Sequence, residues 1–441
     1  MKVVHIAFEC APIYKTGGLG DVVGSLPKVL EKLGIETYVV MPGYAWIKRQ
    51  HFLPGSKVPV IYVDGQWFSK LNSKHERKTQ ATAYAHFCLE VLEELKRRNL
   101  KPDILHCHDW HAGIIPWLLK HQPDGFFAKT KTLLTIHNVS YQGNFDLRYL
   151  DDPQLKSIVD RIPAQTKRIS FLKLGIDSAN YVSTVSPNHA REIRKGQVGF
   201  GLSRVIRKKR GRFIGIINGI DDTTWNPDID RFIKYHFDTK NVNTQKAKNK
   251  RWLEKKLGLL QNDEPLVGMV ARISSQKGFD LVLQFLARLS QLALKLVILG
   301  TGDEFMTREL SSSSRLLPDR LAFAHTFDEA VARQIYAASD FFLIPSVFEP
   351  CGLTQIISMR YGTIPIGAHV GGLVDTIQDG VTGFLFHKHE TKDLLGAIER
   401  SLKVYHDPSA LQVMRLKAMR RDFSWTASAK KYVRLYKKMT G

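Results

Sequence analysis

The sequence predicts an α/β protein with two doubly wound parallel-sheet domains. In both halves of the chain, short apolar runs typical of buried strands alternate with amphipathic helical stretches. Parallel strands joined by right-handed helical crossovers produce this alternation. The chain has 441 residues, of which 44% are hydrophobic. It therefore exceeds one ordinary core and fits two domains of about 200 residues each.

The first half contains six short apolar runs that we expect to form strands. They are residues 3–8, 36–41, 104–108, 132–136, 181–185 and 214–217. Helical patterns lie between them, at residues 22–33 and 81–99. Since each expected strand is followed by a helical or irregular stretch, the strands are expected to run parallel.

A polar stretch separates the two halves. Residues 226–249 have few apolar anchors and several turn residues, so we expect a linker there. A helical pattern at residues 280–293 then follows the first strand of a second series. The expected strands of this series are residues 266–271, 295–300, 321–323, 341–345 and 364–368. We therefore expect a first domain at residues 1–238 and a second at 239–420.

The chain is strongly basic. Its 64 Lys and Arg residues against 42 Asp and Glu residues give a net charge of +22. Such a field attracts polyanions and phosphorylated metabolites. The basic runs at residues 207–212 and 246–256 hold one aromatic residue between them, and no nucleic-acid-binding motif accompanies them. We interpret these runs as solvated surface and expect no nucleic-acid partner.

The sequence favours a cytoplasmic protein. No apolar run approaches the roughly 18 residues of a membrane span, and no signal peptide is recognisable, so no membrane association is expected. The four cysteines have no closely spaced pairs, which fits reduced thiols in a reducing compartment. They are Cys10, Cys88, Cys107 and Cys351.

A glycine-rich turn follows the first expected strand. It contains Lys15, Gly17 and Gly18 and leads to Asp21 in a helical pattern. Glycine lets a ligand approach bare backbone N–H groups, and a helix N-terminus favours an anion. The spacing is neither the dinucleotide fingerprint nor the P-loop, which argues against NAD and NTPase functions. The turn predicts a site for a phosphate-bearing ligand, although a simple tight connection is the alternative.

Charged residues also follow two strands of the second domain. Arg272 and Lys277 flank a short loop and could hold one diphosphate, as a leaving group that gains negative charge requires. Glu349 precedes a proline, with Gly352 and Thr354 beyond, which suits a polar ligand at a helix start. The alternatives are two surface cations and a helix-capping acid.

Residues 106–111 contain several zinc-ligand types. On a strand, His106 and His108 share one face while Cys107 points away, and the helical spacing H-x-x-x-H is absent. We therefore expect no metal site. Asp109 at the strand exit is interpreted as organising the wall of a cleft by hydrogen bonding.

Taken together in chain order, these residues resemble the bacterial glycogen synthases and plant starch synthases of glycosyltransferase family 5. The matching segments span nearly the whole chain: residues 15–22, 108–111, 136–138, 141–143, 218–221, 272–273, 276–278, 345–346, 348–355, 359–363 and 371–373. The resemblance implies the GT-B fold, with two Rossmann-like domains facing a central cleft. The first domain would serve the acceptor and the second the nucleotide sugar, while residues 421–441 would form a helix returning to the first domain.

The resemblance implies a retaining hexosyltransferase that needs no cofactor. It would transfer glucose from ADP-glucose to the non-reducing end of an α-1,4-glucan such as glycogen. UDP-glucose as the donor, and a non-catalytic glucan-binding homologue, remain open alternatives. A glucan phosphorylase shares the fold but needs a pyridoxal phosphate lysine and a much longer chain.

The resemblance also implies the roles of individual residues. The catalytic set would be His137, Arg272, Lys277 and Glu349. The substrate-binding set would be Lys15, Gly17, Gly18, Asp21, Asp109, Asn218, Cys351, Gly352, Leu353 and Thr354. Phe327 stands at a position that is often aromatic beside the nucleotide base. Between residues 41 and 104 the chain is short, and the family's aromatic acceptor-side loop is not recognisable.

Overall fold

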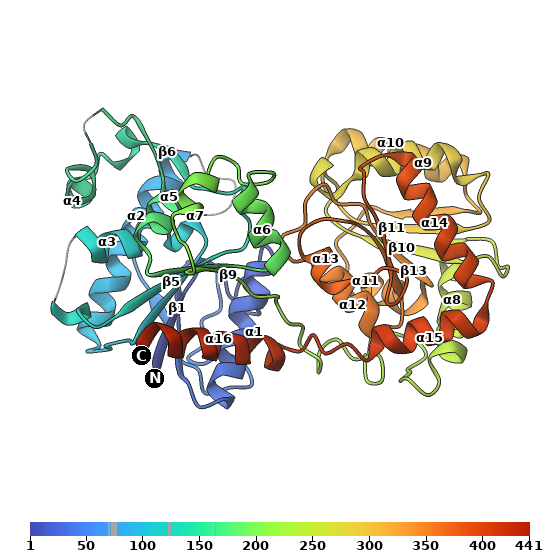
Figure 1. The fold of residues 1–441 in the computed structure, drawn as a ribbon, viewed down its shortest axis with the longest axis horizontal. Helices are drawn as coiled ribbons and strands as arrows, with labels where there is room; N and C mark the ends of the chain where they lie inside the picture. Colours follow the sequence, from blue (N-terminus) through green and yellow to red (C-terminus); the bar gives the residue numbers. More distant parts are fainter. Residues whose placement is uncertain (69–70, 72–76, 122–124, 164) are drawn as a thin grey trace. The chain divides into compact units, whose positions relative to one another are not determined.

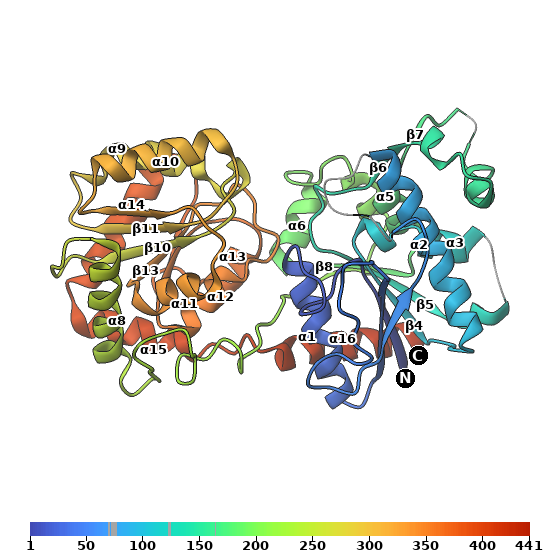
Figure 2. The ribbon, with the colours of Figure 1, turned by 180° about the vertical axis from the view of Figure 1, so that it is seen from behind.

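The computed structural model describes residues 1–68, 71, 77–121, 125–163 and 165–441, which divide into two compact units (Figure 1). The first unit comprises Met1–Gly219 and Trp425–Gly441, and the second comprises Ile220–Ser424. Each unit holds one parallel sheet with helices on both faces (Figure 2). The predicted α/β class is therefore confirmed.

The first sheet has seven strands in the order β3-β2-β1-β4-β5-β8-β9, all parallel. The strand order reverses between β1 and β4, which are neighbours. The strands are β1 (Lys2–Ile6), β2 (Glu36–Pro42), β3 (Val60–Val63), β4 (Ile104–His108), β5 (Lys131–Ile136), β8 (Tyr181–Thr184) and β9 (Phe213–Gly215). A separate antiparallel ribbon pairs β6 (Asn144–Asp146) with β7 (Arg168–Ser170).

Helices cover both faces of the first sheet. They are α1 (Gly18–Lys32), α2 (Arg77–Arg97), α3 (Ile115–His121), α4 (Lys156–Val159), α5 (Phe171–Ser178), α6 (Pro187–Lys195), α7 (Ser203–Arg207) and α16 (Trp425–Thr440). Because α16 is the last helix of the chain, both chain ends lie in this unit, close to each other (Figures 1 and 2).

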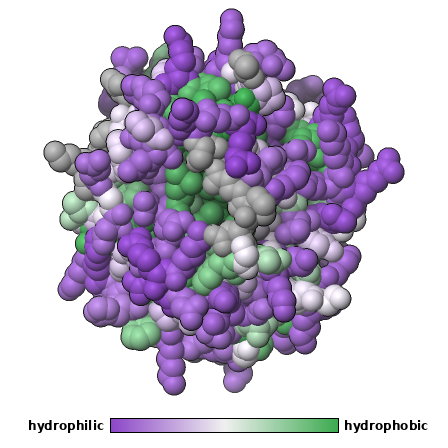
Figure 3. Space-filling model, turned by 90° about the vertical axis from the view of Figure 1, so that its left-hand side faces the viewer, coloured by the Kyte–Doolittle hydropathy of each residue, from purple (hydrophilic) through white to green (hydrophobic). Residues whose placement is uncertain are grey.

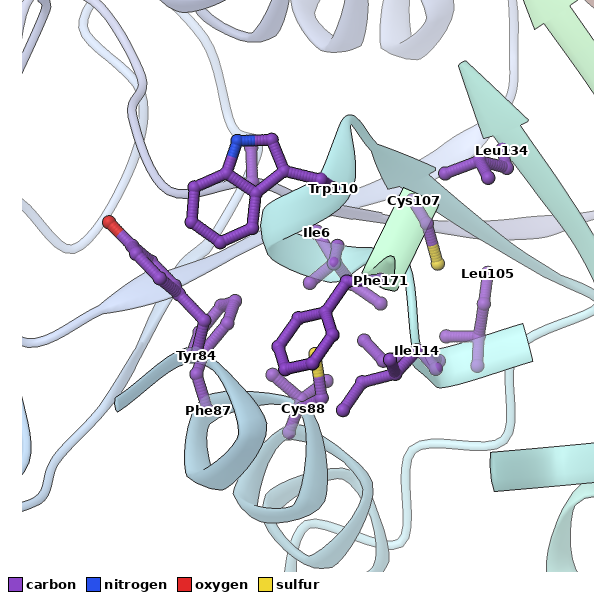
Figure 4. Packing of buried hydrophobic residues seen from close by; sticks show 14 of the residues in the cluster. Ile6, Tyr84, Phe87, Cys88, Leu105, Cys107, Trp110, Ile114, Leu134 and Phe171 are labelled. Atoms are coloured by element: carbon purple, nitrogen blue, oxygen red, sulfur yellow. The ribbon is translucent and has the colours of Figure 1, made fainter. Parts of the chain in front are cut away.

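Alternation along the strands separates the two faces of this sheet. Leu105 and Cys107 of β4 point with Ile6 and Leu134 into an apolar cluster that Phe171 and residues of α2 complete (Figure 4). On the opposite face, alternate residues of the same strands pack against α1 and α16, through Val22, Leu26, Tyr432 and Tyr436 among others. Each fully buried large apolar side chain contributes about 1.5–3 kcal/mol. Both faces therefore anchor the strand ends that carry the predicted site.

The second sheet has six parallel strands in the order β12-β11-β10-β13-β14-β15. Here the order reverses between β10 and β13. The strands are β10 (Leu266–Val270), β11 (Lys295–Leu299), β12 (Leu321–Ala324), β13 (Phe341–Ile344), β14 (Ile364–Ala368) and β15 (Phe384–Phe386). The helices are α8 (Val242–Leu257), α9 (Phe279–Leu289), α10 (Glu304–Leu316), α11 (Glu329–Ala338), α12 (Thr354–Arg360), α13 (Gly371–Thr376), α14 (Thr391–Tyr405) and α15 (Pro408–Met419).

All eleven predicted strands are present, with ends within two residues of the prediction. The sequence did not predict β3, β15 or the β6–β7 ribbon, which are strands of three or four residues. Helix α1 begins at Gly18 rather than at residue 22, since its first turn is made of glycines and a leucine.

The predicted linker at residues 226–249 is wrong in its second part, which begins α8. Lys246 of this helix is fully buried and donates hydrogen bonds to three backbone carbonyls and to Thr363 Oγ1. Polar side chains thus replace the apolar anchors by which a helix is recognised. The unit boundary also lies at Gly219 rather than at residue 238, because Asp230 bonds Arg333 and Tyr361 of the second unit.

Among the described residues, no helix has both the length and the apolar character that a membrane crossing requires. Hydrophilic side chains predominate on the face drawn in Figure 3.

Candidate active site

Several predicted site residues follow the strands at which the order of each sheet reverses, whereas His137 follows β5 and Asn218 follows β9. In the second unit, Arg272 and Lys277 follow β10 and Glu349 follows β13. In the first unit, Lys15 follows β1 and Asp109 follows β4. Ligands of open α/β sheets bind beyond the carboxyl ends of strands at such a switch point. Each unit therefore presents its predicted residues where its topology favours a ligand.

Lys277 and Glu349 form an ion pair at the switch point of the second sheet. Lys277 Nζ lies 2.6 Å from Glu349 Oε2, and Ser346 Oγ donates to the same oxygen over 2.9 Å. Glu349 is buried, so these donors hold its carboxylate in one orientation. Arg272 is exposed and forms no ion pair within the described part of the chain. The site therefore keeps a cation for an anionic ligand, and Lys277 is shared with Glu349.

Close backbone approaches fix the position of Glu349. Gly278 has φ +75°, and a Cβ there would lie 1.9 Å from the carbonyl oxygen of Pro345. Gly371 has φ +46°, and its Cβ would lie 1.8 Å from the carbonyl oxygen of Glu349. Only glycine satisfies both the conformation and the contact at these positions. The loop after β13 is thus packed between two backbone segments.

The predicted residues after Glu349 form the turn into α12. Cys351 is buried, Gly352 has φ +71°, and Leu353 and Thr354 lie at the helix start. The side-chain amide of Gln355 donates to the carbonyls of Cys351 and Gly352, each over 2.9 Å. These bonds stabilise the turn, a role that was not predicted for Gln355.

In the first unit, Glu9 occupies the glycine-rich turn. Its buried carboxylate accepts hydrogen bonds from the backbone N–H groups of Thr16, Gly17 (3.1 Å) and Gly20 (2.8 Å), and from Thr16 Oγ1 (2.6 Å). The expectation of bare amides is therefore wrong at these three positions, because an acid at the end of β1 reaches into the turn. Burial raises the pKa of Glu9, and these hydrogen bonds oppose that effect.

Two more predicted residues of this turn are paired. Lys15 Nζ lies 2.7 Å from Asp21 Oδ1, and both side chains are partly exposed. Gly18 is the first residue of α1. Consequently the turn carries less free positive charge than its sequence suggests.

Asp109 connects the ends of β4 and β5. Its backbone has φ +56° and ψ −171°, and its Oδ1 accepts a hydrogen bond from the N–H of His137 over 2.7 Å. Burial raises the pKa of Asp109 to about 7, while the amides of His137 and Asn138 oppose the shift. Asp109 thus positions the backbone at His137. That it organises the wall of a cleft stays a prediction.

Asn218 is the predicted residue that points most directly to a ligand. It is buried, and its Oδ1 has no hydrogen-bond partner within the part of the chain that the structure describes. A buried amide oxygen without a partner costs free energy. A bound polar group would satisfy it.

Three buried histidines, His5, His106 and His108, have ring nitrogens within 4.8 Å of one another. Both nitrogens of His106 are already engaged, by Tyr436 OH at 2.8 Å and by Thr135 Oγ1 at 2.6 Å. A metal ion would have to displace one of these bonds, so the geometry favours a hydrogen-bonded array. Sequence reasoning identified His106 and His108 but not His5.

Comparisons with known proteins identify the family of this chain. Residues 2–208 match the family described as the starch synthase catalytic domain, and residues 250–416 match glycosyl transferases group 1. The chain is 36% identical over 475 aligned residues to a glycogen synthase of Alkaliphilus metalliredigens, with all of both chains covered. It is 37% identical over 480 residues to a glycogen synthase of Geobacillus stearothermophilus, covering 100% of this chain and 98% of the relative. Both alignments exceed 441 positions, so these relatives contain segments that this chain lacks.

Solved structures show the same similarity. The catalytic domain of starch synthase IV from Arabidopsis thaliana, bound to ADP and acarbose, superposes with a TM-score of 0.91 at 33% identity. The match covers 100% of this chain and 99% of that domain. A sucrose-phosphate synthase from Thermosynechococcus elongatus shares the fold, with a TM-score of 0.68 at 20% identity over 99% of this chain and 98% of that one.

Proposed function

This chain belongs to the family of bacterial glycogen synthases and plant starch synthases, and we propose that it transfers glucose from ADP-glucose to an α-1,4-glucan with retention of configuration. Family membership supports a nucleotide-sugar donor and a glucan acceptor in general. ADP as the nucleotide is supported by the starch synthase IV domain, which was solved with ADP bound.

The cations after β10 support a diphosphate leaving group. Departure of a nucleoside diphosphate places negative charge on its phosphate oxygens, and fixed cations lower the barrier to that step. Arg272 is exposed and unpaired within the described residues, and Lys277 lies five positions later, in the segment between β10 and α9. The observation that carries the proposal is this cation pair at the switch point, next to the buried Glu349. We assign to Glu349 the binding of glucose hydroxyls.

The first unit supplies the groups that we assign to sugar and acceptor. Asn218 offers an unsatisfied buried oxygen, and Asp109 positions His137. We assign Lys15, Asp21, Gly17 and Gly18 to substrate binding as well, with Gly17 acting through its backbone conformation since Glu9 already accepts its N–H. The amides near Leu353 and Thr354 of the second unit are assigned to the donor phosphates.

Retention of configuration enters the proposal from the family resemblance, and the state of two buried carboxylates bears on the mechanism that would produce it. A double displacement needs a free carboxylate nucleophile. Glu349 is held by Lys277 and Ser346, and Glu9 is held by the turn amides. Front-face attack through an oxocarbenium-like transition state uses neither carboxylate as a nucleophile, and cations with backbone donors suffice to stabilise it.

The proposal is tested by release of nucleoside diphosphate in the presence of glycogen. We expect turnover with ADP-glucose that depends on glycogen, and a lower kcat/KM with UDP-glucose. Arg272→Ala and Lys277→Ala should each lower kcat/KM by about 10²–10³, because each removes one positive charge of the protein that would stabilise the leaving group.

Arg288→Ala is the matched control. Arg288 is an exposed arginine near the last residue of α9, so it lies at the sheet edge opposite the switch point. Its loss should leave kcat/KM unchanged. No turnover with either donor would contradict the function, and full activity of Arg272→Ala would contradict the role of the cations.

A further inference from the structure

A row of polar side chains crosses the face of the first sheet that α1 and α16 cover. It consists of His5 on β1, His106 and His108 on β4, Thr135 on β5 and Ser183 on β8, all fully buried. Residues two positions away on the same strands, such as Val3 and Ile104, pack into the apolar layer of that face. Buried faces of parallel sheets are normally apolar, and each buried polar group costs free energy unless it is hydrogen-bonded. Packing alone does not account for this row.

Three imidazoles of this region form a continuous hydrogen-bonded chain. His137 Nε2 lies 3.0 Å from His108 Nδ1, and His108 Nε2 lies 3.1 Å from His5 Nδ1. The far nitrogen of His5, Nε2, is buried and has no hydrogen-bond partner in the described part of the structure. At the other end, His137 is a partly buried residue that follows β5, and no described residue bonds its Nδ1. This chain of hydrogen bonds thus runs from His5 inside the sheet to His137, a predicted residue of the candidate active site.

All three rings are neutral at physiological pH. Burial lowers the pKa of His5 and of His137 to about 3, and the pKa of His108 well below its ordinary value. Each neutral ring has one N–H and one bare nitrogen, and each bond of the chain needs one of each. The three tautomers are therefore coupled, and only two arrangements satisfy both bonds.

The two arrangements differ in what they leave inside the protein. In the first, His5 donates through Nδ1 to His108, which donates through its own Nδ1 to His137, and the unpartnered Nε2 of His5 is a bare acceptor. In the second, all protons move to the other nitrogens, which buries an N–H of His5 without an acceptor. Buried N–H groups without a partner are rarer than unsatisfied acceptors.

We propose that His5 and His108 are positioning residues that hold His137 in the tautomer with its proton on Nδ1. His137 then meets the substrate as a neutral hydrogen-bond donor, which suits an oxygen of a sugar. The role of His137 at the substrate rests on the proposed function; the tautomer does not.

His106 packs against the hydrogen-bonded imidazoles and holds the His108 ring in place. Its ring stacks on that of His108 with centroids 4.2 Å apart, and its nitrogens are fixed by Tyr436 OH and Thr135 Oγ1. Thr135 Oγ1 is in turn bonded to Ser183 Oγ over 2.7 Å. The plane of the His108 ring is therefore held by contacts from α16, β5 and β8.

The tautomers are measured directly by NMR of the full chain labelled with ¹⁵N-histidine, in which protonated and bare ring nitrogens have distinct shifts. His137→Ala and His108→Ala spectra assign the signals. We expect protons on Nδ1 of His5, His108 and His137. A proton on Nε2 of His137 overturns the proposal, and this result does not depend on activity.

Variants of His5 test the functional consequence. His5→Asn keeps a side-chain N–H close to the place of Nδ1, whereas His5→Phe keeps a ring of similar size without it. We expect His5→Phe to lower kcat about tenfold, the effect of one hydrogen bond to a reacting site, and His5→Asn to stay within about twofold of the wild type.

His121→Phe is the control, because His121 lies on α3 and its ring bonds only the Trp117 carbonyl among the described residues. It should keep the wild-type kcat, and melting temperatures establish that each variant folds. A folded His5→Phe with wild-type kcat and an unchanged His137 tautomer overturns the proposal. Absence of turnover in the wild type would instead contradict the proposed function, and the NMR result would still decide the tautomer.

Discussion

Asp109 combines two features that oppose folding. Its φ of +56° with ψ of −171° lies in a region used almost only by glycine, at a cost of about 1–3 kcal/mol. Its carboxyl group is also buried, which disfavours the charged form. The backbone strain and the buried carboxyl group thus occur together at the residue that accepts the hydrogen bond from the His137 N–H. Strain and desolvation at this residue therefore mark the site independently of any motif.

Asp109→Asn should change how stability depends on pH. The folded protein protonates Asp109 with a pKa of about 7, whereas the unfolded chain does so near 3.8. Between these values the folded state retains a proton that the unfolded state releases, so the free energy of unfolding falls by up to about 1.4 kcal/mol per pH unit as pH rises. Asparagine keeps the acceptor without the ionisation.

The measurement is the difference in melting temperature between Asp109→Asn and the wild type from pH 5 to pH 8. The melting temperature of the variant relative to that of the wild type should rise up to about pH 7 and then stay constant. A difference that is the same at every pH would show that burial does not raise this pKa.

For single residues, the sequence predicts which side chains follow the strands but not which partners they bond. Glu349 is identifiable because it follows an apolar run and precedes a proline. Its bonds to Lys277 and Ser346 depend on β10 and β13 being neighbours, which is a property of the sheet. Glu9 lies just after the first expected strand, but its hydrogen bonds to the amides of Gly17 and Gly20 depend on how the turn folds.

Among the elements, the loops after β10 and β13 depend on each other's backbone. The α9 helix begins after Gly278, whose missing side chain lets the Pro345 carbonyl approach. A displacement of the backbone at Gly278 would therefore move both Lys277 and the loop that carries Glu349.

Gly278→Ala should therefore cost more than its conformation alone. The residue has φ +75°, and its new Cβ would meet the Pro345 oxygen at 1.9 Å. Gly258→Ala is the matched control, with φ +72° and nothing within 4 Å of the new Cβ. We expect the control to lose about 1–2 kcal/mol of stability and keep its activity.

Gly278→Ala should lose more stability than the control, and its kcat/KM should fall about 10²-fold, because catalytic groups misplaced by about 1 Å lose that much. Melting temperature and steady-state kinetics check both variants. Equal losses in the two would mean that the loops do not constrain each other.

Element prediction succeeded where apolar runs define the element and failed where polar residues do. Strands β10 and β13 are apolar and bounded by turn residues, so their positions follow from the sequence. Helix α8 is held by Lys246 and Lys250, whose ammonium groups bond carbonyls, a hydroxyl and Asp340. Such anchors look like solvated surface until their partners are placed.

The whole molecule carries a net charge of +22, which should be visible in substrate kinetics. Raising ionic strength from 0.01 to 0.15 M shortens the Debye length from about 30 to about 8 Å. The KM for an anionic nucleotide sugar should then rise several-fold, because its attraction to the protein is screened.

The glucan serves as an internal control because it is neutral. Its KM should stay constant over the same range of salt, measured at saturating donor. Parallel increases in both KM values would indicate a general effect of salt on the enzyme rather than screening of the donor.

The path of the chain has a consequence for biosynthesis. The polypeptide leaves the first unit at Gly219 and rejoins it at Trp425. A ribosome therefore completes the entire second unit before it delivers α16, which covers the imidazole-bearing face of a sheet whose strand β1 was translated before the second unit. Domains generally fold as units during synthesis, N-terminal first. In this protein the first unit is begun before the second and finished after it, and a nascent chain that lacks α16 would leave that face covered by α1 alone.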